Sequence, residues 1–174
     1  MIIGITGGIG SGKSVIAKQL REMGYAVYDS DKEAKRLILE NEQVREKILE
    51  LFGKEVYRDG MYQTELVAQQ VFADSSLLAQ LNAIVHPAVK EDLLRWSHAQ
   101  MNLSRNQILF VECAILYQAG LDSVCEKVVA VTAPEEIRLA RVVARDCTDI
   151  NKVRARMRAQ EVEKDIEKAD ILIN

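Results

Sequence analysis

The sequence has little of what disulfide-bonded and metal-bound proteins need. Its three cysteines, at positions 113, 125 and 147, are odd in number and match neither a disulfide framework nor a pair of zinc-binding thiols. It contains only two histidines, His86 and His98, which excludes a histidine-rich metal centre. Because free thiols persist in a reducing compartment, we expect a cytoplasmic protein.

Long hydrophobic runs and an excess of positive charge are also missing. No apolar stretch approaches the roughly 20 residues needed to cross a bilayer, and the N-terminus lacks the pattern of a secretory signal. The 23 Lys and Arg against 26 Asp and Glu give a formal net charge of −3, which argues against electrostatic binding to nucleic acid. We expect a soluble chain, monomeric or weakly homo-oligomeric, without a membrane or nucleic-acid partner.

Glycine, by contrast, is concentrated at one place. Residues 7–14, Gly-Gly-Ile-Gly-Ser-Gly-Lys-Ser, fit the phosphate-binding pattern G-x-x-x-x-G-K-[ST] without a gap. An apolar run at 2–6 precedes the pattern and an amphipathic stretch ending at Gly24 follows it, so the order is strand, glycine turn, helix. In such a P-loop, N–H groups surround a phosphate chain, Lys13 reaches the β and γ phosphates, and the Ser14 hydroxyl ligates Mg²⁺.

Further apolar runs predict an α/β fold of the P-loop type, with a parallel sheet of about five strands flanked by helices. Strands are expected at 2–6, 25–28, 108–111, 128–131 and 171–173. We expect no strand between 31 and 104, where helical periodicity and a turn at 58–60 predict a helical, substrate-holding insert. The chain is thus divided into a core (1–30 and 105–174) and an insert (31–104).

A P-loop alone does not choose among kinases, switch GTPases and ATPase motors. The chain lacks a DxxG switch, and residues 151–154, Asn-Lys-Val-Arg, only approach the guanine-binding NKxD pattern. A switch GTPase is therefore disfavoured. Small-molecule kinases, such as nucleoside or nucleoside monophosphate kinases, and nucleotide-dependent regulatory modules remain.

Two acidic residues follow the second predicted strand. Asp29 and Asp31 would lie at the carboxyl edge of the sheet, where α/β folds bind ligands and where a carboxylate could accept a proton from a substrate hydroxyl. Alternatively, Ser30 and Glu33 form a capping box and Asp31 is favoured by the helix dipole. The residues alone do not decide between these interpretations.

Arginines crowd the segment after residue 135. Arg138, Arg141 and Arg145 share one face of a predicted helix that begins with a capping box at 132–135, and further arginines follow. The segment 138–160 is either a lid that neutralises phosphate charge or a solvated, salt-bridged face. Arg138 lies one turn earlier than Arg141 and is expected to stay in solvent.

Two isolated residues are weaker candidates. Pro87 should end an apolar helix at His86, because the residue before proline is pushed away from helical geometry. The imidazole would then face a ligand, or it is incidental. Glu112, at the end of the third predicted strand, could support Mg²⁺ through water.

Together these residues resemble the dephospho-CoA kinases, which use ATP to phosphorylate the 3′-hydroxyl of the dephospho-CoA ribose and so complete coenzyme A biosynthesis. The resemblance runs from residue 1 to 174. It is carried by residues 6–14, Asp29-Ser30-Asp31 with Ala34 and Arg36, residues 81–87, and Arg141, Arg145, Asp146, Arg156 and Gln160.

The resemblance implies a role for each part of the chain. Asp31 is implied as the base, the insert as the coenzyme A-binding subdomain, and the arginine helices as an ATP lid, with ATP as donor and Mg²⁺ as cofactor. The implied catalytic residues are Lys13, Asp31, Arg141 and Arg145. The implied ATP ligands are Gly8, Gly10, Ser11, Gly12, Lys13, Ser14, Val15 and Arg141. The implied substrate ligands are Asp29, Asp31, Arg36 and His86, and Ser14 is the implied Mg²⁺ ligand.

The chain also departs from the family pattern. Val15 replaces a usual threonine, residues 112–116, Glu-Cys-Ala-Ile-Leu, replace Asp-Val-Pro-Leu-Leu, and Gln118 stands where an acidic residue is common. Family members usually continue beyond Asn174 through a turn and a final helix, so we expect a truncated chain with apolar sheet surface left uncovered.

Overall fold

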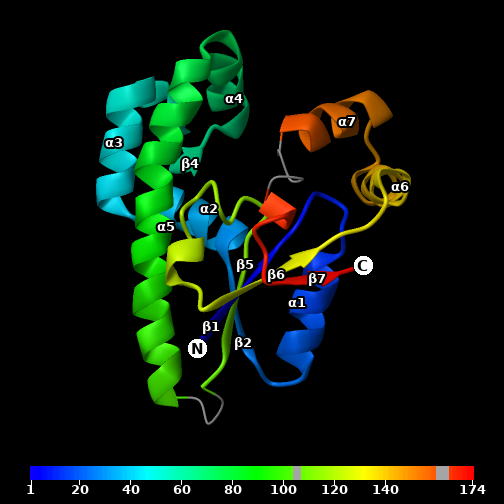
Figure 1. Cartoon of the computed structure of the whole chain (residues 1–174). Coiled ribbons are helices and arrows are strands. Elements are labelled where there is room, and N and C mark those ends of the chain that lie inside the picture. Colours follow the sequence, from blue (N-terminus) through cyan, green and yellow to red (C-terminus); the bar gives the residue numbers. More distant parts are fainter. Residues whose placement is uncertain (104–106, 160–164) are drawn as a thin grey trace. The chain divides into compact units, whose positions relative to one another are not determined.

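A computed structural model describes residues 1–103, 107–159 and 165–174. The chain forms two compact units, which we describe separately: residues 1–29 with 96–174, and residues 30–95. The first unit holds a parallel sheet and its helices, and the second consists mainly of helices (Figure 1). The predicted insert, 31–104, thus extends past the second unit, because the last part of its longest helix groups with the sheet.

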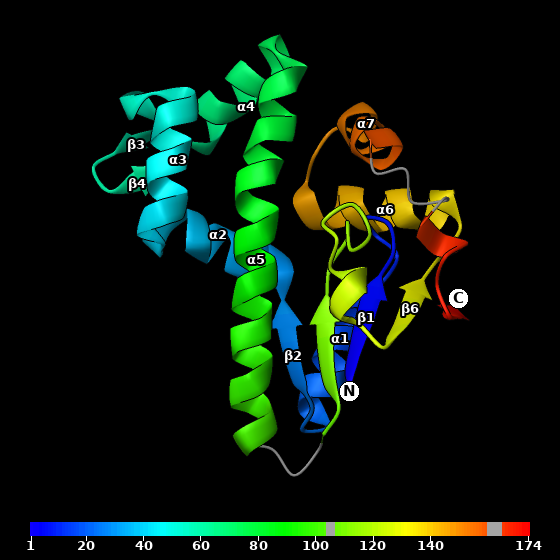
Figure 2. The same cartoon turned by 60° about the vertical axis from the view of Figure 1, so that its left-hand side comes forward.

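The sheet of the first unit has five parallel strands, as predicted. They are β1 (Ile2–Thr6), β2 (Ala26–Asp29), β5 (Leu109–Glu112), β6 (Lys127–Val131) and β7 (Ile171–Ile173), in the order β2-β5-β1-β6-β7. The arrows of β1, β2 and β6 point the same way in Figure 2. Because β1 lies at the centre, the loop after it emerges in the middle of the carboxyl edge, where ligands bind in such sheets.

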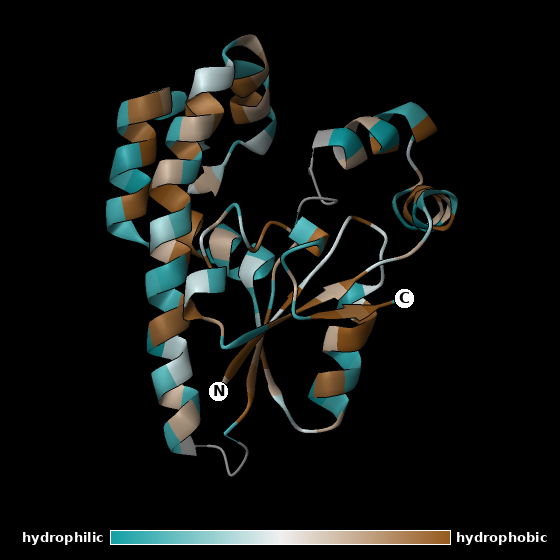
Figure 3. Cartoon of the chain, in the orientation of Figure 1, coloured by the Kyte–Doolittle hydropathy of each residue, from teal (hydrophilic) through white to brown (hydrophobic). Residues whose placement is uncertain are grey.

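Hydrophobic strands form the core of this unit. Ile5, Leu109 and Val111 are at most 1% exposed. In Figure 3 the brown that marks hydrophobic residues runs along the central strands. Helix α1 (Lys13–Glu22) packs on β1, β2 and β5. Tyr28 in β2 contacts the ring of Trp96, with centroids 5.3 Å apart.

Helix α1 ends at the glycine that the sequence predicts. The N–H of Gly24 donates to the carbonyl of Arg21, and the N–H of Tyr25 donates to that of Leu20. These two bonds form a Schellman motif, which needs the positive φ of 87° that Gly24 adopts. The motif turns the chain directly into β2.

The arginine segment forms α6 (Glu135–Asp146) and α7 (Ile150–Ala159). The predicted capping box is wrong: Pro134 is the N-cap, and no side chain caps α6. Thr132 instead extends the pairing of the last two strands, because its N–H donates to the carbonyl oxygen of Ile173. Its hydroxyl also bonds to the side chain of Asn174 at 2.5 Å. Gln160, at the end of the predicted lid, lies outside the described residues.

The last strand, β7, carries apolar side chains on the surface. Ile171, Leu172 and Ile173 are 52%, 53% and 39% exposed. These three side chains form exposed apolar surface at one edge of the sheet.

The second unit is built from helices joined by one small hairpin. Its elements are α2 (Ser30–Glu40), α3 (Glu42–Phe52), the 3₁₀ turn η1 (Lys54–Val56), β3 (Tyr57–Arg58), β4 (Met61–Tyr62), α4 (Thr64–Ala73) and most of α5 (Ser75–Leu103). Val44, Ile48 and Phe52 form the buried face of α3, as their spacing predicts. The turn predicted at 58–60 is also present, with Asp59 and Gly60 at positive φ.

Two predictions for this unit are wrong. The turn joins a two-stranded hairpin where we expected no strand, and its short strands pair through Tyr57 with Tyr62 and Arg58 with Met61. Helix α5 does not end at His86 but continues through Pro87 to Leu103. Its buried residues before and after the proline, Val85 and Val89, hold it as one element although proline removes a helical hydrogen bond.

Candidate active site

The P-loop occupies the turn between β1 and α1. Two of its glycines are required because other elements come too close for a side chain. A Cβ on Gly7 would lie 2.1 Å from the carbonyl oxygen of Val131, and one on Gly10 would lie 2.5 Å from that of Arg138. Both residues also have positive φ, 142° and 79°. The glycines therefore let β6 and α6 pack directly against the loop.

Lys13 opens α1 and points back into the loop. Its ammonium donates to the carbonyl oxygens of Gly7 at 2.6 Å and Gly8 at 3.1 Å, and the residue is only 9% exposed. A lysine held in this way places a positive charge at the start of the loop, where the motif positions it for phosphate.

Ser14 and Glu112 meet at the carboxyl edge of the sheet. The Ser14 hydroxyl lies 2.7 Å from Oε1 of Glu112, which is 8% exposed. Asp29 lies opposite Glu112 in the register of β2 and β5. The structure thus bonds Ser14 to Glu112, for which the sequence evidence is only its place at the end of the third predicted strand. Across the three described ranges, no cluster of three or more His, Cys, Asp or Glu side chains is placed to hold a metal ion.

Two further P-loop positions differ in exposure. Ser11 is buried, and its hydroxyl has no hydrogen-bond partner in residues 1–103, 107–159 and 165–174. Val15 is 61% exposed and offers no hydroxyl at the position where the resemblance places a threonine.

The three arginines of α6 have different surroundings. Nη1 of Arg141 donates to the carbonyl oxygens of Gly10 and Ser11, both at 3.3 Å. Arg145 instead forms two bonds to the neighbouring carboxylate of Asp146, at 2.7 and 3.1 Å, which raise the pKa of Arg145.

The expectation that Arg138 stays in solvent is wrong. This residue is half-buried, and its Nε is buried without a hydrogen-bond partner among the described residues. The side chain faces the P-loop because Gly10 allows the backbone of α6 to approach so closely.

An apolar cluster fixes the two arginine helices to the P-loop. Leu139, Val142 and Val153 form its buried centre, and Ile9, Val143 and Met157 pack against it. Sequence reasoning missed Ile9, because the P-loop pattern accepts any residue at that position. The only signal was a large apolar side chain within a loop of small residues.

The remaining candidate residues belong to the second unit. Asp31 is exposed in the first turn of α2, which begins directly after β2. Arg36 bonds to Glu33 at 2.5 Å and to Asp92 at 2.9 Å, and these carboxylates raise the pKa of its guanidinium. His86 is half-buried in α5, and desolvation lowers its pKa from the ordinary 6.5. None of the described helices is both long and apolar enough to cross a membrane.

Comparison with known proteins agrees with this architecture. The family model for dephospho-CoA kinase matches residues 1–174. The dephospho-CoA kinase of Porphyromonas gingivalis is 41% identical over 167 residues, which cover 96% of this chain and 81% of the relative.

Solved structures give the same fold. TT1252 from Thermus thermophilus is 35% identical and superimposes with a TM-score of 0.82, covering 99% of this chain and 86% of that one. Dephospho-CoA kinase from Campylobacter jejuni, at 24% identity, has a TM-score of 0.69 with coverages of 99% and 86%. The latter likeness concerns the fold alone.

Proposed function

The chain belongs to the dephospho-CoA kinase family, and we propose that it transfers the γ-phosphoryl group of ATP to the ribose 3′-hydroxyl of dephospho-CoA. The products are coenzyme A and ADP. The observation that carries the proposal is the family match over the whole chain, together with a complete P-loop whose lysine is buried at the loop.

Lys13 and Arg141 neutralise charge on the nucleotide. Phosphoryl transfer depends mainly on positioning and electrostatic stabilisation, so cations at the loop lower the barrier. The Lys13 ammonium exchanges its bonds to Gly7 and Gly8 for phosphate oxygens, while Arg141 holds α6 over the loop. Gly8, Gly10, Ser11, Gly12 and Val15 complete the ATP-binding segment, and Arg145 serves in the lid once it leaves Asp146.

The residues at the carboxyl edge suit Mg²⁺. A hydroxyl and a carboxylate 2.7 Å apart are hard oxygen donors, and Mg²⁺ ordinarily binds one or two carboxylates together with substrate phosphates and water. Ser14 and Glu112 would hold the ion, with Asp29 beside them. When bound, the ion supplies neutralisation of charge on the phosphates.

Asp31 is proposed as the base that accepts the proton of the attacking hydroxyl. It is an exposed carboxylate two residues after the end of β2, and so follows the carboxyl edge of the sheet. Asp29, Arg36 and His86 are proposed ligands of dephospho-CoA, with residues 31–104 as the substrate-binding insert. Arg36 is already oriented by Glu33 and Asp92.

We also propose a compartment and an assembly state for the enzyme. It acts in the cytoplasm as a monomer or weak homo-oligomer and needs no nucleic acid or membrane.

A panel of acceptors tests the function. Purified protein with Mg²⁺ and ATP is given dephospho-CoA, adenosine or AMP, and ADP release and phosphorylated product are measured. We expect stoichiometric coenzyme A from dephospho-CoA alone, and Lys13→Ala should lower kcat by about two orders of magnitude or more, as removal of a charge-stabilising group does. Faster turnover of adenosine or AMP would instead favour a nucleoside or nucleoside monophosphate kinase. ATP hydrolysis independent of every acceptor would favour a regulatory module.

A further inference from the structure

A small pocket adjoins the P-loop at the end of β6. It encloses about 250 Å³ and is lined by Gly8, Val131, Thr132, Ala133, Glu135, Arg138 and Ile166. Ordinary ligand pockets measure about 300–1,000 Å³, so this one suits part of a ligand and not a whole nucleotide. Its walls combine apolar side chains with backbone from the first half of the loop.

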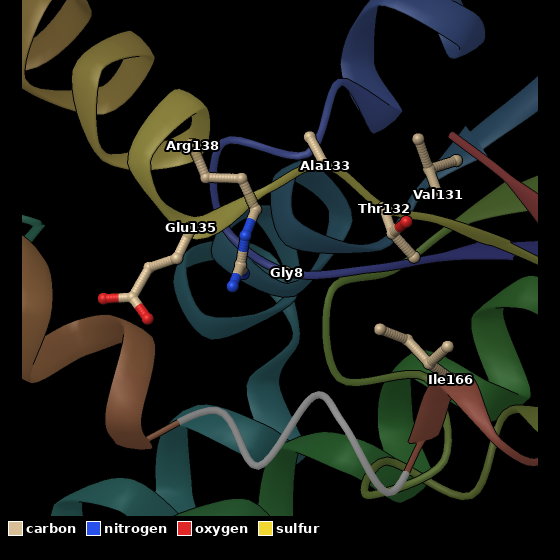
Figure 4. Close-up of a pocket in the computed structure, with 7 residues that line it drawn as sticks. All are labelled: Gly8, Val131, Thr132, Ala133, Glu135, Arg138 and Ile166. Atoms are coloured by element: carbon tan, nitrogen blue, oxygen red, sulfur yellow. The ribbon is translucent and has the colours of Figure 1, made fainter.

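Arg138 is the cationic group of this pocket. Figure 4 shows its side chain leaving α6 with the guanidinium directed toward Gly8, while the carboxylate of Glu135 points away. Within the part of the chain that the structure describes, the buried Nε makes no hydrogen bond, and a buried donor without a partner is costly. An anion that received this donor would remove the cost, so the arrangement favours binding of an anionic group.

The position of Lys13 indicates which anionic group this is. The lysine ammonium bonds to the carbonyl oxygens of Gly7 and Gly8, so Lys13 and Arg138 approach the same end of the loop. P-loop lysines contact the β and γ phosphates. Arg141, one turn later on α6, bonds instead to Gly10 and Ser11, nearer to the start of α1.

We propose that Arg138 binds the terminal phosphate of ATP and thereby makes the site prefer ATP to ADP. This inference rests on the proposed function, since it assumes that the P-loop binds ATP as phosphoryl donor. A guanidinium offers forked donors that match phosphate oxygens, and charged hydrogen bonds of this kind are roughly twice as strong as neutral ones. Arg138 loses its ligand once the γ-phosphoryl group has moved to the acceptor, which favours release of ADP.

Nucleotide titrations test whether Arg138 binds the terminal phosphate of ATP. The full chain is titrated calorimetrically in Mg²⁺ with β,γ-imido-ATP, with ADP, and with ADP plus inorganic phosphate. The variants are Arg138→Met, which keeps the stem length but removes charge, Arg138→Lys, and Arg21→Met as a control in the exposed last turn of α1.

We expect Arg138→Met to weaken binding of the ATP analogue by about tenfold to a hundredfold, the range for lost charged hydrogen bonds. ADP lacks the terminal phosphate, so Arg138→Met removes at most one weak contact from the ADP complex. Binding of ADP should therefore change by less than about twofold. Arg138→Lys should be intermediate, and Arg21→Met should bind both nucleotides as the unsubstituted chain does.

Three outcomes would overturn the proposal. Equal weakening of both nucleotides would assign Arg138 a packing role, and no weakening would remove it from the nucleotide site. Loss of inorganic phosphate binding with unchanged affinity for the ATP analogue would indicate a separate phosphate site. Because no acceptor is present, a chain that passes this test but does not phosphorylate dephospho-CoA would contradict the proposed function alone.

Discussion

Gly10 is the residue on which the packing of α6 against the P-loop depends most directly. Gly10→Ala places a Cβ 2.5 Å from the carbonyl oxygen of Arg138 and 2.9 Å from Cγ2 of Val142. Gly60 has almost the same φ, 77° against 79°, but no atom of the described residues lies within 4 Å of its added Cβ. Gly60→Ala should therefore show the cost of left-handed backbone alone, about 1–2 kcal/mol. Gly10→Ala should cost more and also weaken ATP binding.

Chemical denaturation and nucleotide titration of both variants check this expectation. The difference between them isolates the steric contribution of α6, because the backbone penalty is shared. Equal stabilities with unimpaired ATP binding in Gly10→Ala would mean that α6 does not need its close approach to the loop.

Asp31 carries the proposed proton transfer. Asp31→Asn keeps the size of the side chain but removes its basicity, so kcat should fall by about two to four orders of magnitude while ATP still binds. The control is Glu46→Gln, which neutralises an exposed carboxylate of α3 in the same unit. Single-turnover transfer and ATP titration are measured for both variants. Full activity of Asp31→Asn would leave Asp31 only its helix-dipole role.

The sequence predicts local structure well where a motif fixes the backbone. Lys13 and Ser14 open α1 after the glycine turn that follows β1, as the order of strand, turn and helix predicts. Arg138 could not be placed, because helical spacing gives the angle of a side chain around its own helix but not the element that the helix contacts. The approach of α6 depends on Gly10, 128 positions earlier in the chain.

Helix α5 shows the limit of prediction at the scale of an element. Local chemistry indicates an end at Pro87, but burial of Val85 and Val89 on the same helix outweighs the lost hydrogen bond. The hairpin β3–β4 was missed for a related reason: strands of two residues are too short for any periodicity to show. The five longer strands of the sheet each carry a continuous apolar run and were predicted correctly.

Replacing Pro87 tests how much the proline destabilises α5. Pro87→Ala restores an N–H for the carbonyl of Ala83 and removes the ring, so it should raise the free energy of unfolding by about 1–3 kcal/mol. Pro134→Ala, at the N-cap of α6, is the matched control and should change stability by less than about 1 kcal/mol, because no helical hydrogen bond is lost there. Urea denaturation measures both, and a destabilised Pro87→Ala would show that α5 requires the proline geometry.

At the scale of the whole molecule, acid should lower the free energy of unfolding through His86. Both histidines of the chain lie in α5, and only they have an ordinary side-chain pKa between pH 5 and 8. Burial lowers the pKa of His86 below 6.5. The folded chain therefore binds the His86 proton less readily than the unfolded chain does.

The sign of the effect follows from this difference in proton binding. Above pH 6.5 His86 is neutral in both the folded and the unfolded chain, so its contribution to the free energy of unfolding is fully present. As the pH falls below 6.5, the unfolded chain is protonated first. The free energy of unfolding then declines until the pH has passed the lower pKa of His86 in the folded chain. His86→Gln should remove part of the loss of stability between pH 7.5 and 5.5. Urea denaturation at the two pH values measures this. An unchanged loss in His86→Gln would show that groups other than this imidazole set the acid sensitivity of the fold.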